Sequence, residues 1–143
     1  MKMKSIWDEK MRFTAEIEKH TVSMDTKPPL GEDSAATPKQ LLLAAICGCT
    51  GMDVVALLKK YKQPLSKFEI EAEAFVTEDS YPIVFKEVRL VFQLEGAIEK
   101  DKALEAIALS QTKYCSVSAM LSKVFPINYT VLLNSENKKT GLR

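Results

Sequence analysis

The chain has 143 residues, of which 46% are hydrophobic and 27% charged, and its net charge is +1. This length suits one domain that buries its own core without disulfide staples. Acidic and basic residues are interspersed along most of the chain, with no basic patch, which excludes nucleic acid as an expected partner. We therefore expect a globular protein with a single domain over residues 1–143.

The chain contains three cysteines, Cys47, Cys49 and Cys115. The N-terminal residues lack the apolar run of a signal peptide. Together these features predict a cytoplasmic protein with free or redox-active thiols, since an odd number of cysteines argues against a purely disulfide-bonded framework.

Residues 41–58 form an apolar stretch that is just long enough to be considered as a membrane span. Asp53 stands near its middle, and its insertion would cost about 2.5–3.5 kcal/mol. We therefore predict a helix buried inside the protein or inside a dimer, and no association with a membrane.

The sequence of the N-terminal third predicts three short strands followed by a loop. Residues 11–17 alternate apolar and polar side chains, the period of a half-buried strand. Residues 20–25 alternate in the same way, and residues 1–7 predict a further strand. Residues 26–36 contain two prolines and a glycine among small polar residues, which is typical of a loop.

A long helix is predicted to begin after Thr37. Threonine is a favoured N-cap, and Pro38 suits the first helical position. Gln40 follows Thr37 at the spacing of a capping box. The helix should end near Lys60, because Pro64 follows shortly beyond.

The rest of the chain predicts a strand hairpin, two helices and a final strand. The hairpin strands each present one charged and one apolar face, so this sheet should be covered on one side. The predicted segments are strands 68–76 and 84–94 with a turn at 78–82, helices 99–113 and 116–123, strand 127–133, and a loose tail from 135 to 143. This order predicts an α+β fold in which antiparallel sheet encloses the central helix.

Two cysteines occupy positions suited to thiol chemistry. Cys49 lies between Gly48 and Gly51 in the predicted helix, where each glycine costs about 1 kcal/mol relative to alanine, so another backbone or a ligand should approach closely. Cys115 falls at the predicted start of a helix beside Lys113, where a thiolate is stabilised. Buried cysteines also serve as small hydrophobic residues, and this alternative stays open. Cys47 faces away from Cys49 and is predicted to be core.

Other polar residues offer weaker indications. Asp53 lies one turn beyond Cys49 and could orient a polar group near the thiol, or pair with an amide or a lysine. His20 alternates with apolar residues in a strand, as a packed or rim histidine would. We predict no metal site, because the chain has one histidine and no Cys-x-x-Cys, and a zinc site from the cysteines and His20 is the less favoured alternative. A hydrolase triad and a phosphate-binding glycine loop are excluded by the absence of their motifs.

The two cysteine segments resemble the OsmC/Ohr family. The matching stretches are residues 37–45, 48–50 and 113–117, and the order of elements and the separation of the cysteines fit as well. The resemblance implies an α+β, OsmC-like fold: an intertwined homodimer in which antiparallel sheets enclose two long central helices. It places the active sites at the subunit interface.

The resemblance also implies a reaction without a cofactor. Cys49 would attack the O–O bond of an organic hydroperoxide and become a sulfenic acid, and Cys115 would then form a disulfide with it. An external dithiol would restore both thiols.

The chain departs from the peroxidase members of this family at one charged position. Those members carry a glutamate ten residues before the first cysteine, in a network with an N-terminal arginine; here that position is Lys39, and Arg12 is the only arginine in the N-terminal half. An arginine would lower the thiolate pKa and position the peroxide. Lys39, Lys19 or His20 are candidates to supply positive charge instead. The alternative function is a non-catalytic dimer that binds a small apolar ligand or senses redox state.

Overall fold

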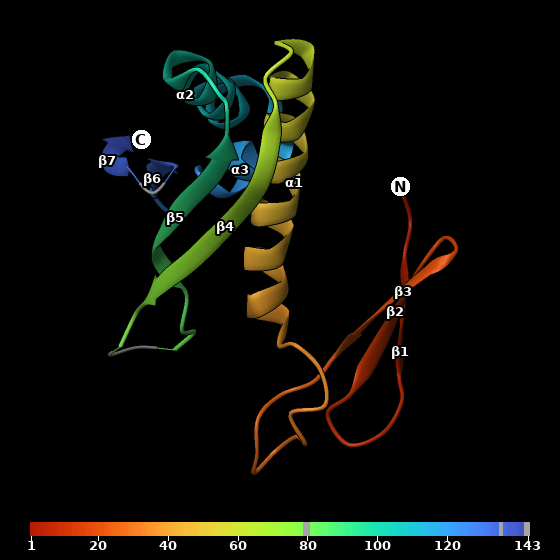
Figure 1. The fold of residues 1–143 in the computed structure, drawn as a ribbon. Helices are drawn as coiled ribbons and strands as arrows, with labels where there is room; N and C mark the ends of the chain where they lie inside the picture. Colours follow the sequence, from red (N-terminus) through yellow and green to blue (C-terminus); the bar gives the residue numbers. More distant parts are fainter. Residues whose placement is uncertain (79–80, 135, 142–143) are drawn as a thin grey trace. The chain divides into compact units, whose positions relative to one another are not determined.

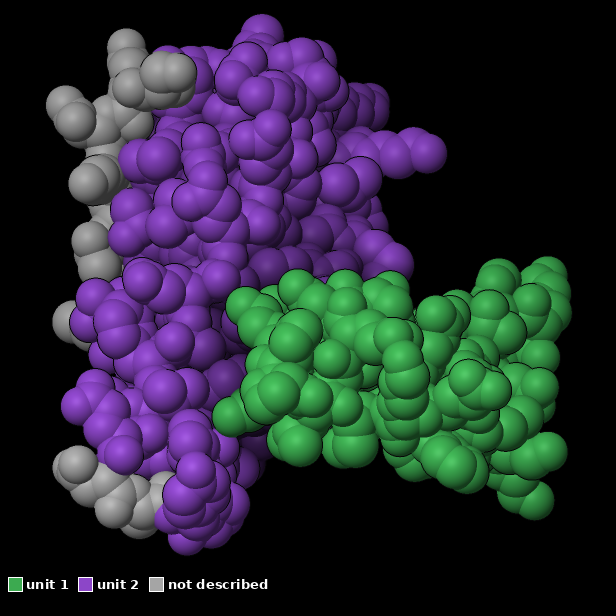
Figure 2. All heavy atoms as spheres, turned by 90° about the horizontal axis from the view of Figure 1, so that it is seen from below, with its two compact units in different colours: residues 1–42 green, residues 43–143 purple. Residues whose placement is uncertain are grey.

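The computed structural model describes residues 1–78, 81–134 and 136–141 (Figure 1). The chain divides into two compact units, residues 1–42 and residues 43–143, which Figure 2 distinguishes by colour. The first unit contains an antiparallel sheet in the order β1-β2-β3. Its strands are β1 (Lys4–Trp7), β2 (Phe13–Ile17) and β3 (His20–Met24). The three predicted strands are therefore confirmed.

The apolar side of β2 is only partly covered in the single chain. Ala15 is buried, whereas Phe13 and Ile17 are each more than a third exposed. The prediction of a half-buried strand is therefore confirmed in part. The alternation of residues identified the apolar side correctly, but it carries no information about what covers that side.

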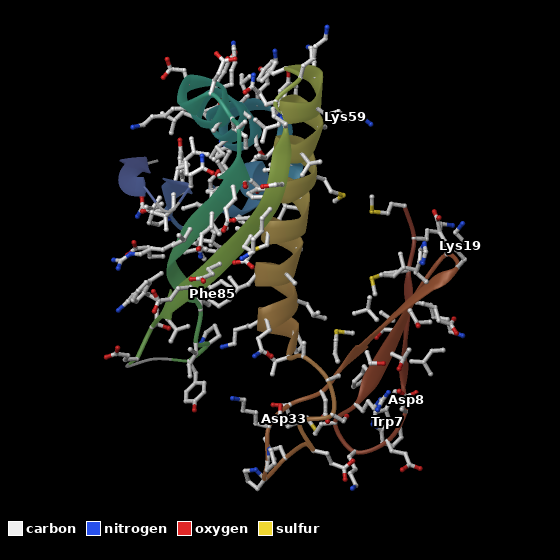
Figure 3. All side chains as sticks on the ribbon, viewed as in Figure 1. Trp7, Asp8, Lys19, Asp33, Lys59 and Phe85 are labelled. Carbon is white, nitrogen blue, oxygen red and sulfur yellow. The ribbon has the colours of Figure 1, made fainter. Side chains whose placement is uncertain are left out.

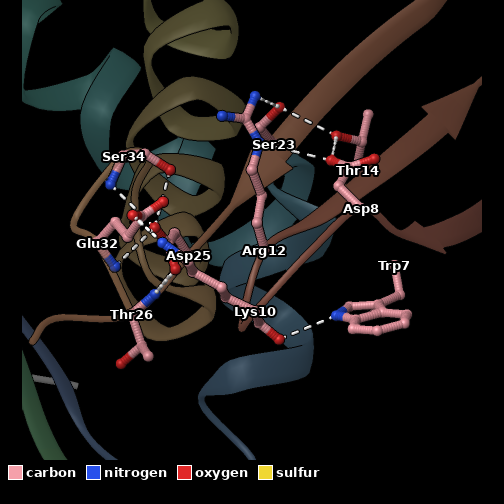
Figure 4. A network of polar contacts seen from close by, with 10 residues as sticks. All are labelled: Trp7, Asp8, Lys10, Arg12, Thr14, Ser23, Asp25, Thr26, Glu32 and Ser34. Carbon is pink, nitrogen blue, oxygen red and sulfur yellow. Dashed lines mark hydrogen bonds and ion pairs between the residues drawn. The ribbon is translucent and has the colours of Figure 1, made fainter. Parts of the chain in front are cut away.

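The loop after β3 is organised around Asp25, as Figure 4 shows. Its buried carboxylate accepts hydrogen bonds from the backbone N–H groups of Thr26, Glu32 and Ser34 at 2.7, 3.2 and 3.0 Å, and from Ser34 Oγ at 2.8 Å. The bonds from Ser34 and then Thr26 lower the pKa of Asp25 to about 2, against the opposing effect of burial. Gly31 fits here because a Cβ would lie 2.2 Å from Thr26 O.

Helix α1 (Pro38–Lys60) has the predicted bounds. The capping box is confirmed: the backbone N–H of Thr37 donates to Gln40 Oε1 at 2.8 Å, and the backbone N–H of Gln40 donates to Thr37 Oγ1 at 3.4 Å. Among the described residues, α1 is the one helix that is long and apolar enough to cross a membrane. Its buried stripe packs in the core of the second unit, so we interpret it as a core helix.

The second unit contains a mixed sheet in the order β4-β5-β6-β7. Its strands are β4 (Leu65–Val76), β5 (Phe85–Gly96), β6 (Ile127–Leu133) and β7 (Glu136–Gly141). The β5–β6 pairing is parallel, which corrects the expectation of a purely antiparallel sheet. A parallel pair needs a long crossover, and the helices between β5 and β6 supply it.

Two predictions for this unit, the loose C-terminal tail and the hairpin turn, involve residues that the structure does not describe in full. Residues 136–141 form β7 against β6, so the prediction of a loose tail was wrong there, because the free edge of β6 offers backbone partners. Residues 135, 142 and 143 of that tail lie outside the described residues, as do residues 79 and 80 of the predicted hairpin turn.

The core of the second unit joins α1 to the sheet and to α2 (Lys100–Leu109). Phe92 is fully buried, stacks on Phe68 at 6.4 Å and meets Tyr129 edge to face at 5.9 Å. The buried residues that α1 contributes are Ile46, Thr50, Val54, Leu57 and Leu58. Figure 3 shows the side chains of this unit, with Lys59 near the end of α1 and Phe85 at the start of β5. This packing fixes the rotation of α1 about its axis, and with it the direction of its polar residues.

A π-helical turn, η1 (Ser110–Tyr114), separates α2 from α3 (Ser116–Leu121). The predicted helical segments are confirmed, but the sequence did not predict the π-turn. Such turns are uncommon and occur often at functional sites. This turn ends at Cys115, whose N–H donates to Ser110 O at 2.9 Å, and Cys115 then becomes the N-cap of α3.

Candidate thiol site

Helix α1 and the η1–α3 junction bring two cysteines together. Cys49 and Asp53 lie one helical turn apart on α1, and Cys115 reaches them from the start of α3. The two Sγ atoms and one carboxylate oxygen of Asp53 all lie within 4.8 Å of one another. The structure therefore brings together the two cysteines that the sequence analysis singled out, with Asp53 beside them.

Cys115 is surrounded by hydrogen-bond donors. Its side chain is 2% exposed, and its Sγ accepts from the backbone N–H of Ser118 at 3.3 Å and from Thr50 Oγ1 at 3.5 Å. Burial is the largest single influence and raises the pKa of Cys115. Hydrogen bonds from Cys49, Ser118 and Thr50 together outweigh it, so the net effect is a lowered pKa.

The pKa of Cys49 shifts in the opposite direction, upward. Burial raises its pKa most, and the hydrogen bond to Cys115 and the negative charge of Asp53 add to the rise, while the amide of Val117 opposes it. Cys49 is partly exposed, unlike Cys115. The proton that the pair shares is therefore favoured on Cys49, which donates it to the sulfur of Cys115.

Asp53 has a defined partner and lies at a small hollow. Ser110 Oγ donates to Asp53 Oδ2 at 3.0 Å. The hollow has a volume of about 220 Å³ and is lined by Asp53, Ala56, Leu57, Lys60 and Tyr114. The walls of the hollow are mostly apolar. It opens beside the carboxylate of Asp53, which has an oxygen within 4.8 Å of both sulfurs.

The other side of α1 forms a shallow apolar groove of about 590 Å³. Its lining residues are Cys47, Gly48, Gly51, Met52, Val55 and Ala56 of α1 with Phe68 and Ile70 of β4. The prediction that Cys47 is core is confirmed in part, since it packs against the core of this unit but is only half-buried. At Gly51 a side chain, rather than the predicted backbone or ligand, approaches closely, since a Cβ would lie 3.3 Å from Ile70 Cδ1. A Cβ at Gly48 would meet nothing within 4 Å in this chain.

The remaining predicted site residues lie in the first unit. Lys39 is in the first turn of α1, and His20 is exposed in β3. Arg12 donates to Ser23 Oγ at 3.3 Å and pairs with Asp8 at 3.4 Å. The roles of Lys39 and His20 at the thiols stay predictions.

The sequence analysis missed Thr50, Ser110, Gln111 and Ser118 at the site. Gln111 is buried, and its Nε2 donates to Thr50 Oγ1 at 3.1 Å. A sequence signal existed for Thr50, because it is the one polar member of the buried stripe of α1. A polar side chain on a buried stripe needs a hydrogen-bond partner, which points to a site nearby.

Comparison with known proteins identifies the family. A model of the OsmC-like protein family matches residues 31–130. Protein YhfA of Escherichia coli K12 is 33% identical over 126 residues, which cover 87% of this chain and 91% of YhfA. The chain belongs to the OsmC-like family, as the sequence predicted.

Solved structures support the same fold. A hypothetical protein from Aquifex aeolicus VF5 superposes with a TM-score of 0.83 at 24% identity, covering 95% of this chain and 97% of that one. An organic hydroperoxide resistance protein OsmC from Legionella pneumophila gives a TM-score of 0.68 at 18% identity, covering 90% and 93%. At these identities the likeness shows the fold alone, and the predicted α+β, OsmC-like class is confirmed.

Proposed function

We propose that this protein reduces organic hydroperoxides with Cys49 as the attacking thiol and Cys115 as the resolving thiol. The observation that carries the proposal is the pair itself: two Sγ atoms within 4.8 Å, one partly exposed and one 2% exposed. The more exposed Cys49 is the thiol that a peroxide from solvent reaches first, and the buried Cys115 is close enough to react with it afterwards.

The closeness of the two sulfurs, which lie within 4.8 Å of each other, supplies the activation step. Cys49 must lose its proton to become a nucleophile. The sulfur of Cys115 takes that proton only as Cys49 attacks, because its lowered pKa favours the thiolate before the reaction. The Cys49 sulfur attacks the distal oxygen of the hydroperoxide and the O–O bond breaks. The leaving alkoxide takes the proton from Cys115 and becomes an alcohol, so Cys115 is a thiolate again. Cys49 is left as a sulfenic acid.

Cys115 then resolves the sulfenic acid. Its thiolate attacks the sulfur of Cys49, the S–O bond breaks, and the departing oxygen leaves as water after protonation. An external dithiol, itself oxidised to a disulfide, returns both cysteines to thiols. The cycle needs no cofactor from the protein.

The hollow beside Asp53 supports an organic rather than an inorganic peroxide. Ala56, Leu57 and Tyr114 offer apolar surface to the organic group beside Asp53, whose carboxylate lies within 4.8 Å of the reacting sulfur. The Legionella pneumophila protein of similar fold is described as an organic hydroperoxide resistance protein, which agrees with this substrate class.

We further propose that the working form is a cytoplasmic homodimer of single-domain chains. The apolar groove on α1 includes Met52, 71% exposed, and Val55, 45% exposed. A second copy of the chain would cover this surface, which an isolated soluble chain would leave in water.

The test is stopped-flow reaction of the reduced protein with cumene hydroperoxide, followed by mass mapping of the cysteines. We expect rapid consumption of peroxide and a Cys49–Cys115 disulfide. Cys49→Ser should abolish the reaction, whereas Cys115→Ser should leave a sulfenic acid on Cys49. Cys47→Ser is the matched control on the same helix and should react normally. Thiols that stay unreacted after prolonged exposure would overturn the proposal.

The second candidate function is redox sensing or ligand binding without turnover. The raised pKa of Cys49 favours it, because a thiol attacks peroxide far more slowly than a thiolate. The lysine at position 39, where peroxidase members carry glutamate, points the same way. Oxidation once by stoichiometric peroxide, with no turnover in the presence of a dithiol, would select the sensor. A structural role for both cysteines predicts thiols that resist labelling until the chain unfolds.

A further inference from the structure

Three metal-ligating atoms meet at the thiol site. Cys49 Sγ, Cys115 Sγ and a carboxylate oxygen of Asp53 lie within 4.8 Å of one another. In a tetrahedral zinc site, with Zn–S near 2.3 Å and Zn–O of about 2.0–2.2 Å, the ligand atoms lie roughly 3.5–4 Å apart. The arrangement therefore needs only a small contraction to surround a single ion.

The supporting hydrogen bonds orient these atoms as outer-shell partners of a metal site do. Ser110 Oγ donates to Asp53 Oδ2 at 3.0 Å, and the backbone N–H of Ser118 donates to Cys115 Sγ at 3.3 Å. Such bonds fix the direction of Asp53 and Cys115 and stabilise thiolate charge on Cys115.

We propose that the reduced Cys49–Cys115 pair, together with Asp53, binds a thiophilic divalent cation such as Zn²⁺. The sequence predicted no metal site because it has one histidine and no Cys-x-x-Cys. The less favoured zinc site used His20 and Cys47, whereas the structure places Asp53 beside the two thiols. Three protein ligands leave the fourth tetrahedral position for water or an exogenous ligand. Binding releases the remaining thiol protons and holds both sulfurs on the ion.

The proposal does not depend on the peroxidase reaction, although it has a consequence for it. Sulfurs bonded to the ion cannot form a disulfide with each other until the ion leaves. A metal-loaded protein should therefore be protected from oxidation, whether the pair turns over or acts as a sensor.

The test is anaerobic titration of the reduced full-length protein with Co²⁺, followed by displacement with Zn²⁺. We expect a sulfur-to-cobalt charge-transfer band that saturates at one ion per chain, with tetrahedral d–d bands in the visible. Asp53→Asn keeps a hydrogen-bonding side chain and should weaken binding roughly tenfold or more. Cys49→Ser and Cys115→Ser should remove most of the charge-transfer intensity. Cys47→Ser is the control and should bind as the unmodified protein does.

Several outcomes would contradict the proposed metal site. The absence of a charge-transfer band excludes the two thiolates as ligands. Equal affinity in Asp53→Asn and the unmodified protein excludes the carboxylate. Loss of binding in Cys47→Ser assigns the ion to another place. None of these results bears on peroxide reduction, which is measured separately on metal-free protein, so the two proposals fail independently.

Discussion

Thr50 Oγ1 lies 3.5 Å from Cys115 Sγ, and the same hydroxyl accepts a hydrogen bond from Gln111 Nε2 at 3.1 Å. Because the amide of Gln111 occupies the acceptor side of the hydroxyl, the hydroxyl proton is directed at the sulfur. All three residues are buried. The buried stripe of α1 therefore contributes a donor that favours a thiolate on Cys115.

Thr50→Val tests this relationship with a side chain of the same shape. The variant should raise the pKa of Cys115, because the thiolate loses one of its donors. It should also destabilise the fold by about 1–3 kcal/mol, since Gln111 Nε2 is left buried without its acceptor. The measurements are the ultraviolet absorbance of the thiolate against pH and urea unfolding.

Thr112→Val is the matched control. Thr112 is exposed, and its hydroxyl donates to Ala108 O at 2.8 Å. This change should leave the thiolate titration as it is. A titration that is the same in both variants would show that the Thr50 hydroxyl does not stabilise the thiolate.

The sequence predicted most of the fold because local chemistry determines those parts. Thr37 and Gln40 fixed the start of α1, and the residue periods identified the strands and helices. The parallel pairing of β5 with β6 was missed, because alternation defines a strand but not its neighbour. The strand β7 was missed because a polar segment gains its structure from the edge of β6.

The candidate site was predicted in part. Cys49 and Cys115 were singled out by their segments, and Asp53 by its spacing on the helix. Ser118 and Gln111 could not be assigned to the site, because their contacts depend on the π-turn and on the rotation of α1 against the sheet. Those are consequences of core packing, which no local pattern reports.

Asp25 should make folding stability depend on pH in the acid range. Its pKa of about 2 in the folded chain lies below the usual value near 3.9 in an unfolded one. The unfolded state therefore binds the proton more readily, so the stabilisation is fully present above about pH 4 and is lost as the pH falls through about 2. Asp25→Asn should lose the part of the acid dependence that Asp25 contributes, so its unfolding free energy should fall less steeply with pH in urea unfolding across this range.

Asp33→Asn provides the control in the same loop. Asp33 is exposed and has a φ of 56°, a conformation that asparagine also adopts readily. The unfolding free energy of the Asp33→Asn variant should equal that of the unmodified protein at each pH. If Asp25→Asn shows the same acid dependence as the unmodified protein, the hydrogen bonds at Asp25 do not couple protonation to folding.

Phe92→Ala should cause one of the largest losses of stability in the second unit. The ring is fully buried between Phe68 and Tyr129. Its removal should lower the free energy of unfolding by about 3–5 kcal/mol, the cost of a large cavity. Val124→Ala, at a position 75% exposed, is the control and should change it by less than about 0.5 kcal/mol. A loss below about 1 kcal/mol at Phe92 would show that the core readily collapses around the gap.

Gly48→Ala tests whether the apolar groove on α1 is exposed to solvent or covered by a second copy of the chain. In the single chain, a Cβ at this position meets nothing within 4 Å. If the chain were monomeric, alanine should stabilise the helix by about 0.8–1 kcal/mol, because glycine is the poorer helix former. If a second copy packs on the groove, the added methyl should instead weaken the dimer, and Gly48→Leu should weaken it further.

The measurement is sedimentation velocity across a range of protein concentrations, together with thermal unfolding. We expect the unmodified protein to sediment as a dimer and Gly48→Leu to shift toward the monomer. Met52→Gln, which changes a side chain 71% exposed in the same groove, should shift it in the same direction. Glu105→Gln, on exposed surface of α2 away from the groove, should sediment as the unmodified protein does. A monomer at all concentrations, with Gly48→Ala more stable than the unmodified protein, would remove the dimer from the proposed function while leaving the cysteine pair intact within one chain.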